Sequence, residues 1–187
     1  MNKAIFFDRD GTLNKEIFRK ELQKWTAPHN PVEVRIDTKI INLLKKLKKK
    51  NFLFFIVSNQ PDYALGLTDI KNLNSVHKKI NKIFSLNSIK ICEYFYSYKH
   101  PQSIRKKYGP PCFDRKPNPY FLKKAKKKYN IDLYNSWIIG DRQTDIECGK
   151  RAGTKTIGII NNRYEFNKKK NKPDFIFRSI NKIIDVI

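Results

Sequence analysis

The N-terminal stretch, residues 3–13, constrains the fold of this chain more than any other feature. An apolar run of strand length, Ala4 to Phe7, ends in two aspartates one residue apart, Asp8 and Asp10, and a Gly-Thr turn follows. This pattern predicts a buried strand that carries carboxylates at its tip. Because burying an unpaired carboxylate is costly, the pair indicates a metal or catalytic site. The alternative is a solvated Asx turn that closes the strand.

Further apolar runs alternate with helical patterns along the chain. The segment 52–57 is apolar at every position, which is typical of a strand buried on both faces in a parallel sheet. Other strands are expected at 89–96, 136–139, 154–160 and 175–177. Helices are expected at about 38–50 and 68–84, from Pro117 or Pro119 to about 129, and at 143–152, with a last amphipathic helix from about 179. This alternation predicts a doubly wound α/β fold, with a mainly parallel sheet flanked by helices.

Two long segments show no sustained periodicity. We expect residues 14–36, which are polar and aromatic, to form a loop with a short hairpin near the site. Residues 97–116 form a second irregular segment, and long ordered loops often have a function. The length of the chain suits one domain, so we expect a single domain over residues 1–187.

The charge of the chain first favours a nucleic-acid partner. Forty Lys and Arg against seventeen Asp and Glu give a formal charge of +23. The lysines, however, crowd the polar faces of expected helices (45–50 and 123–128) and one loop (168–172), among many Asn and Ile residues. This is typical of an AT-rich genome. Arg, the residue preferred for bidentate phosphate and base recognition, is scarce beside Lys. We therefore expect a small anionic substrate and no nucleic acid.

The remaining composition points to a cytoplasmic protein. No run of about 18 apolar residues is present, and no apolar signal segment follows Met1. We expect a monomer that has no membrane contact. The three cysteines are an odd number without framework spacing, which argues against a disulfide scaffold.

The Asp-x-Asp-Gly-Thr pattern at 8–12 resembles the first motif of the haloacid dehalogenase-like (HAD-like) phosphatases. Ser58 follows the second apolar run, Lys116 lies in an Arg-Lys-Pro sequence, and Asp141 opens Asp-Arg-Gln-Thr-Asp, in the order that the family requires. The joint pattern is far more specific than any single motif. The gaps between the motifs hold no insert of domain size, so the resemblance implies a member without a large cap. Asp145 is expected either to orient its motif by hydrogen bonds or to cap the following helix.

The resemblance implies phosphoryl transfer in two steps. Asp8 would be the nucleophile that becomes a phosphoaspartate, and Asp10 the general acid and base. Mg²⁺ would neutralise the repulsion between carboxylate and phosphate, held by Asp8, the backbone carbonyl of Asp10 and Asp141. Ser58 and Lys116 would bind and stabilise the phosphoryl oxygens.

Within the superfamily, the motifs most resemble the D-glycero-D-manno-heptose 1,7-bisphosphate phosphatases and their histidinol-phosphatase relatives. On this analogy, four side chains are candidates for contacting the sugar or its second phosphate: Asn59, Gln60, Arg115 and Arg142. Heptose bisphosphate is the favoured substrate and histidinol phosphate the second. A polynucleotide end phosphatase would use the same chemistry, but the sequence shows no organised aromatic or arginine platform. A non-catalytic protein of the same fold is disfavoured by the intact motifs.

One loop departs from these relatives, which carry zinc on Cys-x-His and Cys-x-Cys pairs before the motif lysine. The equivalent positions here are Ser97, Lys99, Cys112 and Asp114. A tetrahedral structural zinc needs four good ligands, and a lysine ammonium is not one. We therefore expect no zinc, although His100 leaves a rearranged site as the alternative.

Overall fold

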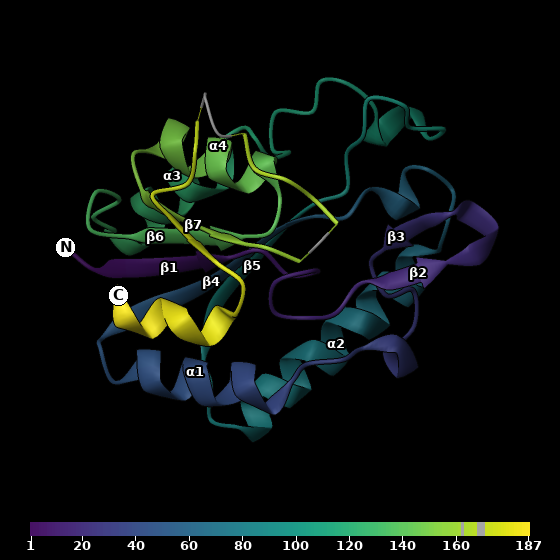
Figure 1. Cartoon of the computed structure of the whole chain (residues 1–187). Coiled ribbons are helices and arrows are strands. Elements are labelled where there is room, and N and C mark those ends of the chain that lie inside the picture. Colours follow the sequence, from purple (N-terminus) through teal and green to yellow (C-terminus); the bar gives the residue numbers. More distant parts are fainter. Residues whose placement is uncertain (162, 168–170) are drawn as a thin grey trace.

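The computed structural model describes residues 1–161, 163–167 and 171–187 (Figure 1). Within them, a six-stranded sheet has the order β5-β4-β1-β6-β7-β8. The strands are β1 (Lys3–Phe7), β4 (Phe52–Asn59), β5 (Ile91–Ser97), β6 (Trp137–Gly140), β7 (Lys155–Ile159) and β8 (Phe175–Phe177). Each neighbouring pair in this sheet is parallel, so all the carboxyl ends lie at one edge. This confirms the predicted α/β class.

Helices cover both faces of the sheet (Figure 1). One face carries α1 (Thr38–Lys48), α2 (Ile70–Leu86) and a short 3₁₀ helix at Ile180–Asp185, and the other carries α3 (Tyr120–Tyr129) and α4 (Gln143–Ala152). Right-handed crossovers that place helices on both faces produce this doubly wound arrangement.

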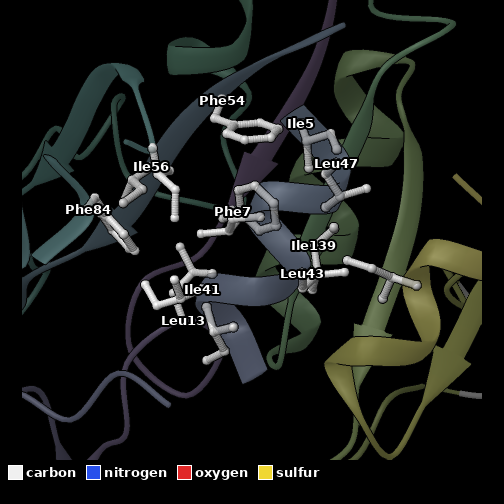
Figure 2. Close-up of a cluster of buried hydrophobic side chains, with 14 of the residues drawn as sticks. Ile5, Phe7, Leu13, Ile41, Leu43, Leu47, Phe54, Ile56, Phe84 and Ile139 are labelled. Carbon is white, nitrogen blue, oxygen red and sulfur yellow. The ribbon is translucent and has the colours of Figure 1, made fainter. Parts of the chain in front are cut away.

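The central strand β1 is buried on both faces because its side chains alternate between two cores. Ile5 and Phe7 point into the layer of α1 and α2 (Figure 2), whereas Ala4 and Phe6 pack on the layer of α3 and α4. All four are 0% exposed. Burying a side chain the size of Ile or Phe contributes about 1.5–3 kcal/mol. This explains the continuous apolar run before the two aspartates.

Several ends of the elements differ from the sequence expectation. β4 continues through Ser58 and Asn59, because they pair in register with Tyr96 and Ser97 of β5. α1 begins as predicted, since the Asp37 carboxylate accepts a hydrogen bond from the backbone N–H of Lys39 at 2.9 Å. The helix expected to open at Pro117 or Pro119 begins at Tyr120, directly after Pro119, and the expected last helix is a single short 3₁₀ segment.

The two irregular segments lie beyond the carboxyl ends of the strands (Figure 1). Residues 14–36 contain the predicted hairpin, formed by the antiparallel strands β2 (Ile17–Arg19) and β3 (Lys24–Thr26). Residues 97–116 hold one 3₁₀ turn, Lys106–Tyr108. Of the lysine-rich loop at 168–172, Lys168 to Lys170 lie outside the described residues. No helix in the described part of the chain is long and apolar enough to cross a membrane.

Candidate active site

Three of the predicted motifs meet because β1 lies between β4 and β6 in the sheet. Asp8 follows β1, Ser58 ends the apolar part of β4, and Asp141 follows β6. The backbone N–H of Asp8 donates to the carbonyl of Ile139 at 2.8 Å, which continues the pairing of β1 with β6 up to the site. Parallel strands thus deliver all three side chains to one edge.

The fourth motif reaches this edge from the irregular segment 97–116. Its residue Lys116 is held by the amide of Asn59, which accepts from the Lys116 backbone N–H at 3.0 Å and donates to the Lys116 carbonyl at 3.1 Å. Asn59 therefore fixes the motif lysine against the end of β4.

A cavity of about 460 Å³ opens at this edge of the sheet. Its floor consists of Asp8, Asp10, Ser58, Lys116 and Asp145. Its wall includes Glu16, the hairpin residues 23–27, Asp62, His100, Arg115, Arg142 and Tyr164. A volume of this size suits a small-molecule substrate.

Lys116 joins two carboxylates at the floor. Its Nζ lies 2.6 Å from Oδ1 of Asp8 and 2.6 Å from Oδ1 of Asp145, and it donates to the Val57 carbonyl at 2.6 Å. Burial by itself lowers the pKa of Lys116, but the charges of Asp145 and Asp8 outweigh it and raise the pKa above its ordinary value. The side chain is therefore a cation at neutral pH.

Asp8, Asp141 and Asp145 form an acidic cluster whose ligand atoms all lie within 4.8 Å of one another. Burial, followed by the charges of Asp8, Asp145 and Glu16, raises the pKa of Asp141 to about 8. Burial also raises the pKa of Asp8 to about 6, against the opposing effect of Lys116. One lysine does not balance three carboxylates, and their hard oxygens are the donors that a divalent cation such as Mg²⁺ prefers. The residues present thus fit such an ion.

Asp145 fulfils both expectations at once. Its Oδ2 accepts from the backbone N–H of Arg142 at 3.0 Å, which caps α4, while its Oδ1 faces the ammonium of Lys116. The carboxylate of Asp10, in contrast, lies outside the acidic cluster and accepts hydrogen bonds from Arg9 and Gln60.

Two motif glycines make room for this cluster. Gly11 has φ +92, and a Cβ there would lie 2.2 Å from Oδ2 of Asp141. A Cβ at Gly140 would lie 2.2 Å from Oδ2 of Asp145. The Gly-Thr turn read from the sequence is therefore required by the close approach of another motif's carboxylate.

The four expected substrate contacts divide into two groups. Asn59, Arg115 and Arg142 line the cavity. Gln60 does not: it is 1% exposed, and its amide group is bound to Arg9, Asp10 and Ser58. A substrate contact at Gln60 stays a prediction, because β4 and the turn after it direct this side chain towards Asp10 and Ser58 beside the cavity.

Sequence reasoning missed a set of residues on the wall. Glu16 is buried and pairs with two arginines, Arg142 and, at 2.6 Å, Arg163. Arg163 also lies 4.2 Å from the ring centroid of Trp25. An arm of about 360 Å³ between Arg115, Arg142 and Arg163 adjoins the cavity. These contacts join segments far apart in the sequence, and no local pattern marks them.

The positions equivalent to the relatives' zinc ligands form contacts of their own. The Ser97 hydroxyl donates to Oδ1 of Asp114 at 2.9 Å. The Lys99 ammonium lies 5.5 Å from the ring centroid of Phe113, and Cys112 is half-buried. The expectation that no zinc binds here stays a prediction.

Comparisons with known proteins agree with the geometry of the site. The HAD-hydrolase-like family model matches residues 113–183. The D-glycero-alpha-D-manno-heptose-1,7-bisphosphate 7-phosphatase of Photorhabdus laumondii is 30% identical over 158 residues, 84% of this chain and 82% of that protein. The chain belongs to the HAD-like phosphatases. It is accordingly an enzyme that hydrolyses phosphate esters.

Further similarities span nearly the whole HAD-like chain. The protein of the same name from Campylobacter jejuni is 28% identical over 185 residues, 98% of this chain and 94% of that protein. The crystal structure of D,D-heptose 1,7-bisphosphate phosphatase from B. bronchiseptica, complexed with magnesium and phosphate, aligns with a TM-score of 0.80. It has 20% identity and covers 98% of this chain and 97% of that one. At this identity the structural likeness establishes the fold.

Proposed function

We propose that this HAD-like phosphatase removes a phosphate from a phosphorylated sugar through a phosphoaspartate on Asp8, with heptose 1,7-bisphosphate as the leading substrate. The observation that carries the proposal is the pairing of Asp8 with Lys116 at 2.6 Å on the floor of the cavity. A carboxylate held by a buried cation at the base of a pocket is oriented for attack on phosphorus.

In the first step, a carboxylate oxygen of Asp8 attacks phosphorus as the bond to the leaving oxygen breaks. Lys116 offsets the negative charge that gathers on the phosphoryl oxygens, and the Ser58 hydroxyl donates to one of them. Asp10 gives its proton to the leaving oxygen. In the second step, water attacks phosphorus, Asp10 takes the water proton, and the Asp8 carboxylate is released with inorganic phosphate.

We assign Mg²⁺ to the acidic cluster, with Asp8, Asp141 and the backbone carbonyl of Asp10 as its protein ligands. The bound ion would neutralise the charge between the carboxylate and the phosphate. The support is the unbalanced charge of the cluster, together with the magnesium in the similar structure from B. bronchiseptica. Asp145 is not among these ligands in our proposal; it pairs with Lys116 beside them.

The substrate assignment rests on the names of the relatives and on the wall of the cavity. The matched relatives include enzymes named for the alpha and for the beta anomer of heptose bisphosphate. Arg115 and Arg142 line the wall, where they would receive the second phosphate, and Asn59 lines both the cavity and its adjoining arm. Histidinol phosphate is the second candidate. We regard residues 1–187 as one phosphatase domain that acts as a cytoplasmic monomer on a small molecule and not on nucleic acid.

Phosphate release with Mg²⁺ tests the proposal. The substrates are both anomers of heptose 1,7-bisphosphate, histidinol phosphate and a 3′-phosphorylated oligonucleotide, each with wild-type protein and with Asp8→Asn as the matched control. For the wild-type protein, we expect the highest kcat/KM on one anomer of heptose bisphosphate. We expect no phosphate release by Asp8→Asn on any substrate. A preference for the oligonucleotide would contradict the sugar-phosphate substrate. Activity that survives in Asp8→Asn would contradict Asp8 as the nucleophile.

A further inference from the structure

Arg9 is a buried arginine that the proposed chemistry does not use. It stands between the two motif aspartates, yet it is 1% exposed and is the largest fully buried side chain among the described residues. Removing a guanidinium from water is costly unless its charge and its donors are matched. The residues that match Arg9 therefore indicate what it does in this fold.

Most of its contacts lead to Asp10. The guanidinium donates through Nε to Oδ2 of Asp10 at 2.9 Å, and its Nη2 lies 2.7 Å from the same oxygen. Nη2 also donates to Oε1 of Gln60 at 2.6 Å. On its other side, the guanidinium carbon lies 5.1 Å from the ring centroid of Tyr96.

Gln60 closes a triangle with this pair. Its Nε2 donates to Oδ2 of Asp10 at 2.7 Å and to the hydroxyl of Ser58 at 3.0 Å. The opposite amide orientation would turn Oε1 towards the Asp10 carboxylate and the NH₂ group towards Arg9, so only one orientation suits both neighbours. Asn14 donates to the other oxygen, Oδ1 of Asp10, at 3.0 Å. Both oxygens of Asp10 are therefore fixed in direction by donors from the protein.

We infer that Arg9 and Gln60 are positioning residues that hold the Asp10 carboxyl group at the edge of the cavity, in the orientation from which it exchanges a proton with the leaving oxygen. This inference rests on the proposed function. Neither side chain needs to touch substrate, because both act through Asp10. Loss of either one removes a donor from Oδ2 of Asp10 and lets the carboxyl group shift, and a small misplacement of a reacting group is costly to the rate.

The leaving group distinguishes this role from a purely structural one. An alkyl or sugar oxygen leaves slowly unless it receives a proton as its bond to phosphorus breaks, whereas p-nitrophenolate leaves readily without one. The constant kcat/KM reports the reaction through the first phosphoryl transfer, in which Asp10 donates that proton. A residue that positions Asp10 should therefore matter for a sugar phosphate and matter little for p-nitrophenyl phosphate.

The test compares kcat/KM on a sugar phosphate and on p-nitrophenyl phosphate. We expect Asp10→Asn to lose about 100-fold or more on the sugar phosphate and far less on the aryl ester. Arg9→Met and Gln60→Met should each lose about tenfold or more on the sugar phosphate and less than about threefold on the aryl ester. In the Asp10→Asn background, either substitution should add little further selective loss, because residues that act as a unit are not additive.

Ser136→Ala is the matched control. The Ser136 hydroxyl is a buried hydrogen-bonding group that accepts from the backbone N–H of Ala4 at 2.9 Å, at the edge of the sheet opposite the site. Its loss should change both substrates by the same small factor. If Arg9→Met does not fold, Arg9→Lys and Gln60→Met carry the same comparison.

The outcomes separate the two claims. Equal losses on both substrates in the Arg9 and Gln60 variants, or a selective loss that adds in full to that of Asp10→Asn, would overturn the positioning role. A wild-type protein that hydrolyses neither ester would instead overturn the proposed function. A selective loss in Asp10→Asn, with none in the Arg9 and Gln60 variants, would overturn the positioning role and leave the proposed function intact.

Discussion

The floor and the wall of the cavity are built in different ways. The floor consists of buried groups, Asp8, Asp10, Ser58, Lys116 and Asp145, and its central ion pair at 2.6 Å joins Lys116 to Asp8 across 108 positions of sequence. The wall is made mostly of partly or fully exposed side chains from the hairpin and from loops, such as Trp25 beneath Arg163, although Glu16 in it is buried. Buried, hydrogen-bonded charges are costly to disturb, whereas exposed pairs contribute about 0–1 kcal/mol. The difference suggests that the floor fixes the reaction and that the wall selects the substrate.

The largest expected effect lies on the floor. Asp8→Asn should abolish turnover, by about a thousandfold or more, because an amide of nearly the same shape lacks the charge to attack phosphorus. The fold should persist, because an amide of nearly the same shape fills the site and the Lys116 ammonium keeps Asp145 and the Val57 carbonyl as partners. Steady-state rates together with circular dichroism check both statements. More than about a tenth of the wild-type rate would contradict the covalent mechanism.

Removal of the metal should have the next largest effect. The acidic cluster offers hard oxygen ligands and no soft ones, so we expect EDTA to remove activity by about a hundredfold or more and Mg²⁺ to restore it. Assays with Mg²⁺, Ca²⁺ and chelator measure this. Full turnover by a chelated, metal-free sample would contradict the assignment of Mg²⁺ to the acidic cluster.

The same cluster predicts how pH acts on the metal-free protein. Burial raises the pKa of Asp8 to about 6 and that of Asp141 to about 8, both above the value near 4 of an unfolded chain. The folded state thus retains protons that the unfolded state has lost. The contribution of these two groups to the free energy of unfolding is therefore greatest below about pH 4. The contribution of Asp8 is lost as pH rises through about 6, and that of Asp141 as pH rises through about 8.

Mg²⁺ must displace those protons, so its apparent affinity should rise with pH, by up to about tenfold per unit for each proton released. Thermal melts with and without Mg²⁺ from pH 5.5 to 8.5 test this, and we expect the increase in Tm to grow with pH. Asp141→Asn should flatten the rise above pH 7. A metal-induced shift that is the same at every pH in the wild-type protein would contradict the assignment.

Substitutions on the wall should change the preference between substrates more than they change kcat. Arg115 lines both the cavity and its adjoining arm, and its Nη1 donates only to the carbonyl of Lys99 among the hydrogen bonds in the described part of the chain. Arg115→Met should raise KM for a sugar bisphosphate about tenfold, since a charge-assisted contact to phosphate is lost, with kcat within about threefold. KM for a monophosphate should change less. A fall in kcat of the size seen for Asp8→Asn would place Arg115 on the floor.

The difference between floor and wall also explains what the sequence could predict. Asp8, Ser58 and Asp141 each follow an apolar run, and parallel strands bring such positions together whatever the loops do. The burial of Gln60 and the pairing of Glu16 with two arginines depend instead on where side chains from separate loops meet. The hairpin was predictable from composition, but its contact with Arg163 was not, because that contact crosses about 140 positions of sequence without a local signal.

The smallest expected effect concerns Cys112, on the loop that replaces the relatives' zinc loop. Ser97 and Asp114 bond to each other, and Lys99 brings a cation to the remaining position. A site with one thiolate, and at most His100 besides, lacks the coordination by which structural zinc contributes to folding. We therefore expect the dialysed protein to hold no stoichiometric zinc and Cys112→Ser to change kcat/KM by less than about twofold. The hydrogen bond between Ser97 and Asp114 should then order the loop, so Ser97→Ala should lower Tm more than Cys112→Ser does. Elemental analysis that finds about one zinc per chain, lost in Cys112→Ser, would instead show that the loop binds zinc with a rearranged set of ligands.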